Sequence, residues 1–169
     1  MPRISLLTLL RYPIFLHLLP ANLLRGFAAG VASVLPAIAL SIGLDEGTTA
    51  LMVSVDAIAH LLGCAAFAFA IKFIPPRFAV GIASLFFCLL PFLMTDNPFI
   101  FLLLFGVFTF ARYIVNYAVP ASLRFSVSAE MAGPYNAWRM ILHNGGVLLA
   151  TTVAVFIPVN ILLILSVIA

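Results

Sequence analysis

Residues 78–94 read FAVGIASLFFCLLPFLM, and this segment contains no charged side chain. The same apolar character extends over nearly all of Leu18–Ala169. Of the whole chain, 65% of the residues are hydrophobic and 8% are charged, and the mean hydropathy is +1.28. A water-soluble domain has about 25% charged residues, so this chain lacks the polar residues that a surface in water requires. The sequence therefore predicts an all-α integral membrane protein.

Breaks in the apolar sequence divide it into segments of membrane-spanning length. A helix rises about 1.5 Å per residue and the hydrocarbon core is about 30 Å thick, so a span needs about 20 residues. Residues 1–20 include Arg3 and Arg11 and are expected to form a separate interfacial segment. Residues 21–169 are expected to form the transmembrane domain. Its predicted spans are residues 21–42, 48–71, 78–94, 99–119 and 134–156, followed by a short last segment at residues 159–169.

The only sizeable polar segment within this domain runs from Pro120 to Tyr135 and contains Arg124 and Glu130. We expect it to be a loop between the fourth and fifth spans. Because proline is favoured in the first turn of a helix, we also expect Pro134 to open the fifth span.

Positive charges lie on one side of the predicted spans. The basic residues of the N-terminal lead and of alternate breaks are Arg3, Arg11, Arg25, Lys72, Arg77, Arg124 and Arg139. The opposite breaks contain Asp45, Glu46 and Asp96 and no Lys or Arg. Since cytoplasmic loops carry an excess of Lys and Arg, the N-terminus is predicted to be cytoplasmic. A removable signal peptide is not expected, because no small-residue cleavage site precedes a soluble domain.

The composition argues against several classes of function. The net charge of +3 comes from basic residues that are spread one or two at a time, so nucleic acid is not an expected partner. Cys64 and Cys88 fall inside predicted spans, where a thiol acts as a small apolar side chain, and no disulfide or metal site is predicted. The sequence has no catalytic triad pattern and no glycine-rich phosphate loop. We therefore expect neither an enzyme nor a cofactor.

Polar residues inside the predicted spans are the candidates for function. An ionised side chain that faces lipid costs at least about 3 kcal/mol, so Asp56 and Arg112 are expected to face the protein interior or water. His60 lies one helical turn beyond Asp56, and Asn116 lies one turn beyond Arg112. These four residues and His143 make up the predicted substrate-binding or proton-binding set. Alternatively, Asp56 is a neutral hydrogen-bonded group, His60 packs in the bundle, and Arg112 reaches the cytoplasmic interface.

Small residues in two of the predicted spans indicate close helix packing. Gly26 and Gly30 are four residues apart in the first span, and Gly145 and Gly146 are adjacent in the fifth. Such residues let two helix backbones approach closely. We expect them to serve packing, and Pro36 can bend the first span.

Several motifs occur in the order found in one half of a major facilitator superfamily transporter. They are Arg11-Tyr-Pro13, Asn22-Leu-Leu-Arg25-Gly26-Phe-Ala-Ala-Gly30, Gly63 with the turn from Lys72 to Arg77, Arg112-Tyr-Ile-Val-Asn116-Tyr-Ala118, and Ser128-Ala-Glu130 with Gly133-Pro134 and Arg139. The chain resembles such a half over essentially its whole length. Ile71, Lys72 and Phe73 stand where the family's signature loop has an aspartate and a second arginine, so the resemblance is to a C-terminal half. The glycine-proline motif of antiporters is also absent, since His143-Asn-Gly145-Gly146 stands there.

The resemblance implies a six-helix bundle of two inverted three-helix repeats, and transport of a small solute by alternating access about a site near the membrane midplane. It also implies a second half, either another copy of this chain or a separate chain. We expect the two to meet on the faces that carry Arg25, Asp56, Arg112 and His143, within the lipid bilayer of a cell membrane such as a bacterial inner membrane. Alternatively, the chain is a non-transporting subunit with the same half fold that serves in the assembly of a larger membrane complex.

Overall fold

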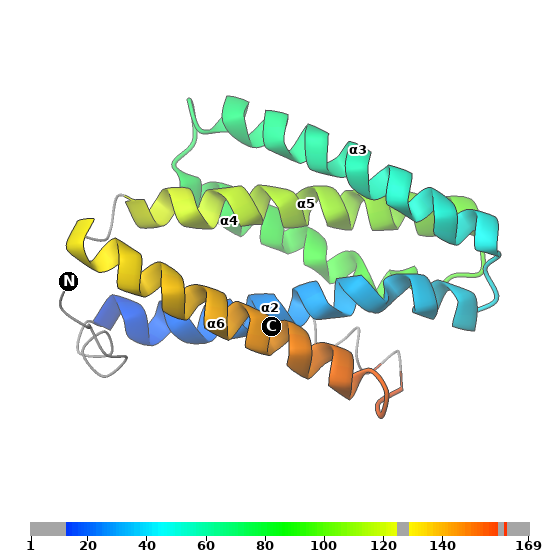
Figure 1. Cartoon of the computed structure of the whole chain (residues 1–169). Coiled ribbons are helices and arrows are strands. Elements are labelled where there is room, and N and C mark those ends of the chain that lie inside the picture. The colour runs from blue at the N-terminus through cyan, green and yellow to red at the C-terminus, as the bar shows by residue number, and fades with distance from the viewer. Residues whose placement is uncertain (1–12, 125–128, 159–160, 162–169) are drawn as a thin grey trace. The chain divides into compact units, whose positions relative to one another are not determined.

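A computed structural model describes residues 13–124, 129–158 and 161 (Figure 1). The regular structure of these residues is entirely helical. The elements are α2 (Pro13–Ser41), α3 (Glu46–Ala70), α4 (Pro76–Leu85), the 3₁₀ helix η1 (Phe86–Leu93), α5 (Pro98–Arg124) and α6 (Ala129–Val153). The predicted all-α class is confirmed for this part of the chain.

Four helical segments are long and apolar enough to cross a membrane: Pro20–Ser41, Glu46–Ala70, Pro76–Leu93 and Pro98–Ser122. They coincide with the first four predicted spans and are compatible with a multi-pass membrane protein. The helix α6 has 25 residues, as α3 does, but is more polar and is not among the four. The fifth span at residues 134–156 therefore stays a prediction. Residues 1–12 of the interfacial segment and residues 159–169 of the short last segment, except Ile161, lie outside the described residues.

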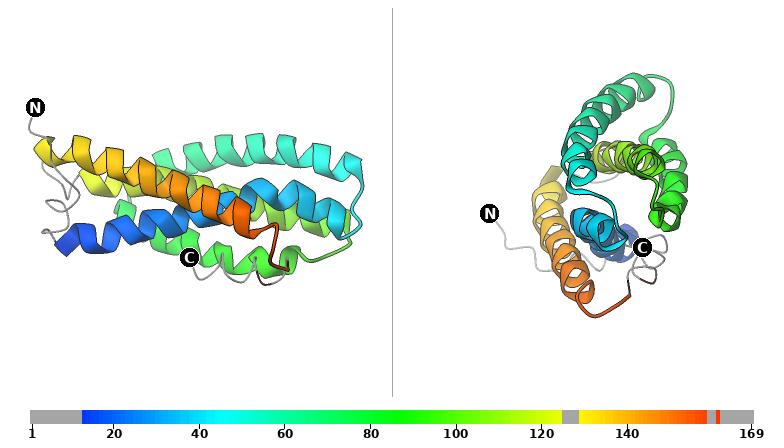
Figure 2. Two further views of the ribbon diagram at one scale, coloured as in Figure 1. Left: turned by 60° about the horizontal axis from the view of Figure 1, so that its bottom comes forward. Right: turned by 90° about the vertical axis from the view of Figure 1, so that its right-hand side faces the viewer.

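The chain divides into two compact units. Unit 1 comprises Met1–Val34 and Val127–Ala169, and unit 2 comprises Leu35–Ser126, so that α2 contributes to both. In unit 1, α2 and α6 lie side by side, as Figure 2 shows. In unit 2, α5 packs against α3 and also against α4 and η1. The helix α5 is therefore the central element of unit 2.

A glycine ends α2 where the sequence predicts the end of the first span. Gly43 has φ +93°, a left-handed conformation that glycine adopts without a steric penalty. Its backbone N–H donates to the Leu40 carbonyl, and the N–H of Leu44 donates to the Ala39 carbonyl, both at 3.1 Å. This pair of bonds is the Schellman arrangement, which satisfies the last carbonyl groups of a helix.

Polar side chains cap the N-termini of α3 and α5. The Asp45 carboxylate accepts hydrogen bonds from the Thr48 hydroxyl and, at 2.8 Å, from the Thr48 backbone N–H. These two bonds, the hydroxyl bond foremost, hold the pKa of Asp45 below its usual range. The Asn97 side-chain oxygen accepts from the backbone N–H groups of Phe99 and Ile100, each at 3.1 Å. Such caps satisfy amide groups that have no partner inside the helix.

The predicted loop from Pro120 to Tyr135 is wrong at both ends. The helix α5 continues through Pro120 to Arg124, and α6 already begins at Ala129, so Pro134 lies inside α6 and not in its first turn. A proline removes one backbone hydrogen bond from a helix, but helices in membranes tolerate this because neighbouring groups and small local adjustments satisfy the freed carbonyl. In the third span, the α-helix gives way to the 3₁₀ helix η1, which contains Pro91.

Candidate functional site between α3 and α5

Two glycines let α3 and α5 pack closely in unit 2. A Cβ atom added to Gly63 would lie 3.0 Å from the Cβ of Tyr113 and 3.1 Å from the carbonyl oxygen of Phe110. A Cβ atom added to Gly106 would lie 3.1 Å from Cγ1 of Val55. The absence of side chains at these positions therefore allows polar side chains of α3 to reach those of α5.

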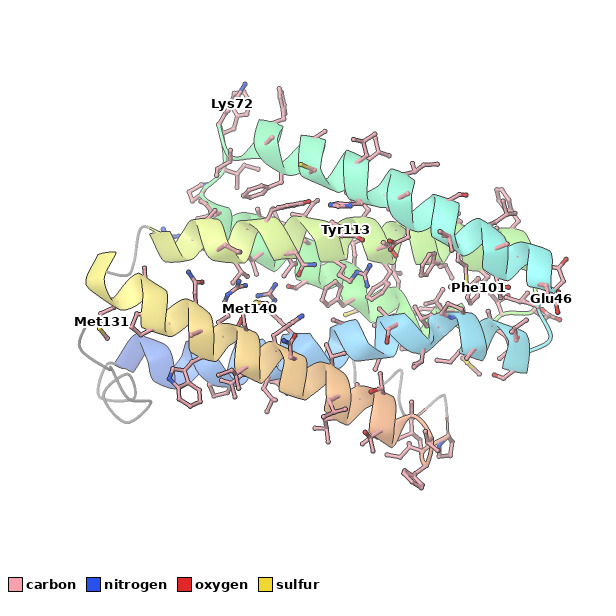
Figure 3. The ribbon with its side chains drawn as sticks, viewed as in Figure 1. Glu46, Lys72, Phe101, Tyr113, Met131 and Met140 are labelled. Atoms are coloured by element: carbon pink, nitrogen blue, oxygen red, sulfur yellow. The ribbon has the colours of Figure 1, made fainter. Side chains whose placement is uncertain are left out.

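Asp56 on α3 and Arg112 on α5 form an ion pair. Nη2 of Arg112 donates to Oδ1 of Asp56 at 2.8 Å, and the hydroxyl of Tyr113 donates to Oδ2 at 2.9 Å. The guanidinium carbon of Arg112 also lies 5.0 Å from the ring centroid of Tyr113, which is labelled in Figure 3. Both carboxylate oxygens are thus bonded across the helix interface. The pair has no net charge, and this would lower the cost of holding two ionised groups inside a membrane.

The ion pair is open on one side. The side chain of Asp56 is 35% exposed and that of Arg112 is 21% exposed. The Nε atom of Arg112 is buried and has no hydrogen-bond partner among the described residues. Since a guanidinium has five N–H donors, any further acceptor has to reach the exposed part of the Arg112 side chain and not the buried Nε.

His60 extends this cluster by one turn of α3. Its ring stacks on the ring of Tyr113, with centroids 4.1 Å apart and planes inclined by 15°. Its Nε2 atom shares a hydrogen bond of 2.5 Å with the hydroxyl of Tyr117. The ring of Phe67 in turn stacks on Tyr117 with centroids 6.3 Å apart. The cluster therefore runs from the ion pair toward the C-terminal end of α3.

Three of the predicted site residues meet in this cluster: Asp56, His60 and Arg112. Asn116 lies on α5 one turn beyond Arg112, and its side chain is exposed. His143 is a residue of α6 in unit 1, where its backbone carbonyl packs against Gly26 of α2. His143 and the cluster therefore belong to different units.

Tyr113 and Tyr117 are the residues of the cluster that the sequence analysis does not predict. Their signal is a matching spacing, since they are four residues apart on α5, as Asp56 and His60 are on α3. Residues four apart share a helix face, so the two pairs can meet if the helices run parallel. The sequence alone does not give the rotation of either helix, and it therefore leaves this pairing open.

An apolar cavity of about 340 Å³ also lies between α3 and α5. Its walls include Val55, Leu62 and Phe110, and every residue around it is aliphatic, aromatic or glycine. Such a cavity suits an apolar group and offers no side chain that fixes the orientation of a polar ligand.

Within the described part of the chain, no three side chains of His, Cys, Asp or Glu are close enough together to hold a metal ion. No protein-family model matches the chain, and no curated protein or solved structure matches it either. The resemblance to a major facilitator half therefore rests on the sequence motifs alone. The inverted repeats, the orientation and the second half stay predictions.

Proposed function

We propose that this chain is a membrane transport protein of the major facilitator type, which moves a small solute by alternating access together with a second half. The proposed location is a cell membrane. In this proposal, the cluster at Asp56 and Arg112 binds the solute or the proton that drives its movement, and the second half closes the other side of the pathway.

The observation that supports the proposal is the partly open ion pair between two helices of membrane-spanning length. An ionised side chain inside a membrane costs at least about 3 kcal/mol more than an apolar side chain. If the ion pair served only to hold α3 against α5, apolar side chains could replace it with little loss of stability. The pair also keeps one side exposed. Polar groups of this kind inside a membrane mark pathways for solutes and ions.

Uptake by purified protein in liposomes tests this proposal. A panel of radiolabelled small solutes, with and without a proton gradient, should contain at least one whose uptake exceeds that of empty liposomes. Asp56→Asn should abolish that uptake, because it removes the charge that Arg112 neutralises. Tyr113→Phe keeps the ion pair but removes one hydrogen bond to Asp56, and it should reduce uptake by a smaller factor.

Asp96→Asn is the matched control. Asp96 is an exposed acidic residue in the turn before α5, and its replacement should leave uptake at the parent level. Equal uptake by the Asp56→Asn variant and the parent would contradict the proposed role of the cluster.

The alternative is a subunit that has the half fold and serves in the assembly of a membrane complex. This alternative is favoured by the bonds that both carboxylate oxygens of Asp56 accept from Arg112 and Tyr113, because such a network can hold α3 and α5 together without any solute. Mass measurement of the gently extracted native complex separates the two functions. A pair of halves supports transport, and an unrelated set of partner chains supports assembly.

A further inference from the structure

The excess positive charge of the chain is concentrated in unit 1. This unit contains four arginines and a single acidic residue, Glu130, whereas unit 2 contains four basic and four acidic residues. The net charge of +3 therefore lies in unit 1. Two of its arginines are described by the structure, Arg25 on α2 and Arg139 on α6. One carboxylate cannot balance the charges of both.

Hydrogen bonds connect Arg25 to α6. Nη1 of Arg25 donates to the side-chain oxygen of Asn22 at 3.3 Å, and the Asn22 amide donates to the Tyr135 hydroxyl at 3.0 Å. Asn22 and Tyr135 are both 2% exposed. One turn further along α2, a Cβ atom at Gly26 would lie 2.9 Å from Cα of His143. The guanidinium of Arg25 is therefore held beside the contact between the two helices of unit 1.

Arg139 lies in the middle of the α6 face that packs against α2. This face is marked by three buried residues that contact α2: Tyr135, Gly146 and Ala150. Successive residues of a helix are rotated by about 100°, so position 139 falls between these three on the helix surface. Arg139 also follows Tyr135 by one turn, and such residues are neighbours. The two arginines thus flank the hydrogen bond between Asn22 and Tyr135, and the charge of Arg139 acts on Arg25.

The protein satisfies little of the bonding capacity of Arg139. Nη2 of Arg139 donates to Sδ of Met140 at 3.7 Å, and a thioether is a weak acceptor. Met140 is labelled in Figure 3. Nε of Arg139 is buried and has no hydrogen-bond partner among the described residues. Arg25 and Arg139 are both half-buried, so a ligand has to reach the exposed parts of their side chains.

The geometry and the charge of this pair favour a phosphate group. The planar fork of a guanidinium binds carboxylate and phosphate oxygens in pairs. A carboxylate carries one negative charge, which would leave one of the two arginines unbalanced. A phosphate monoester carries about −1.5 to −2 at pH 7 and has three strong acceptor oxygens. It can therefore accept from two guanidinium groups and balance both.

We propose that Arg25 and Arg139 form a binding site for a doubly charged phosphate group, which is supplied by inorganic phosphate or by the headgroup of a phosphomonoester lipid. The phosphate oxygens accept hydrogen bonds from one guanidinium on α2 and one on α6, and the bound group connects the two helices. Asn22 positions Arg25 through its side-chain oxygen. The site lies in unit 1 and is independent of the proposed transport function.

Equilibrium dialysis of radiolabelled orthophosphate tests the soluble source. The full-length protein is used in a neutral detergent without phospholipid, at about pH 7, where phosphate is largely doubly charged. Arg139→Gln and Arg25→Gln should each lower the affinity about 10- to 100-fold, because each removes charged donors. Arg139→Lys retains the charge but not the planar fork, so its affinity should lie between those of the parent and Arg139→Gln.

Arg77→Gln is the matched control. Arg77 is an exposed arginine of unit 2, and its replacement changes the net charge by the same amount. Its affinity for orthophosphate should equal that of the parent. Orthophosphate should also raise the temperature of thermal unfolding of the parent and of Arg77→Gln, but not of Arg139→Gln, because only a protein that binds the ligand is stabilised by it.

Native mass spectrometry tests the lipid source. The protein is reconstituted with phosphatidylcholine, either alone or mixed with phosphatidic acid, and the lipid that stays bound after gentle extraction is identified. Retention of phosphatidic acid by the parent and its loss in Arg139→Gln would assign the site to a lipid headgroup. Binding of orthophosphate alone would assign it to a soluble phosphate.

Three results would overturn the site. The first is that the parent binds neither orthophosphate nor phosphatidic acid. The second is an equal loss of affinity in Arg77→Gln and Arg139→Gln, which would show a general attraction of anions to a basic protein. The third is unchanged affinity in Arg25→Gln, which would remove α2 from the site. Circular dichroism of each variant establishes that it is folded.

Discussion

The adjacent glycines of α6 should respond in opposite directions to the same substitution. A Cβ atom at Gly146 would collide with the carbonyl oxygen of Leu23 and lie 2.7 Å from the backbone nitrogen of Phe27, both on α2. A Cβ atom at Gly145 would meet only Cδ1 of Leu23, at 3.9 Å, which is ordinary van der Waals contact. The first collision is with backbone and cannot be relieved by a change of rotamer.

The magnitudes follow from two opposing effects. Replacing a helical glycine by alanine stabilises the helix by about 1 kcal/mol, and this gain applies at both positions. Overpacking costs about 1–3 kcal/mol or more, and a backbone collision belongs at the upper end. We therefore expect Gly145→Ala to stabilise unit 1 by up to about 1 kcal/mol, and Gly146→Ala to destabilise it by about 2 kcal/mol.

Reversible unfolding in mixed micelles measures these free energies. The single tryptophan of the chain, Trp138, lies on α6 and reports its tertiary packing by fluorescence. Gly26→Ala should resemble Gly146→Ala, because a Cβ at Gly26 meets the His143 backbone across the same contact. The double variant should lose less than the sum of the two single losses, since either substitution already separates the helices. A Gly146→Ala protein as stable as Gly145→Ala would refute the close contact of α2 and α6.

Three further predictions concern the caps, the core of unit 1 and the topology. The folded-state pKa of Asp45 is lowered by its bonds to Thr48, so its contribution to stability is present above its unfolded pKa of about 3.9 and is lost as the pH falls through the folded value. Asp45→Ala should remove this pH dependence from acid unfolding curves. An unchanged pH dependence would exclude the cap as its source. The Asn22 amide donates a buried hydrogen bond of 3.0 Å to the Tyr135 hydroxyl. Tyr135→Phe removes this acceptor and should lower the free energy of unfolding by about 1–2 kcal/mol. An unchanged free energy would show that water replaces the hydroxyl. Single cysteines are introduced into a variant without Cys64 and Cys88, as Glu46→Cys or Asp96→Cys in the predicted outer loops and as Ile74→Cys in the predicted cytoplasmic loop. A membrane-impermeant thiol reagent should label the first two cysteines and not the third. The reverse pattern of labelling would invert the predicted topology.

The sequence by itself determines the all-helical, membrane-compatible class and the ends of several helices. These properties depend on local chemistry: the length and hydropathy of each segment, glycine at Gly43, and the side-chain caps at Asp45 and Asn97. The positions of Pro120 and Pro134 inside helices are the exception. In both cases the lost backbone bond costs less than ending the helix, and that balance depends on the surroundings of the helix.

Only the tertiary structure decides which residues meet. The sequence places Asp56 and Arg112 in different spans and requires each to avoid lipid, but their direct bond and its support by Tyr113 depend on how α3 and α5 are rotated and aligned. The same holds for the glycines, because Gly146 faces the backbone of α2 and the adjacent Gly145 does not. Successive residues of a helix are rotated by about 100°, so one of two adjacent glycines can face another helix while the other faces away from it. Hydropathy that is high on all sides of a span does not specify this rotation, and the contacts between helices do.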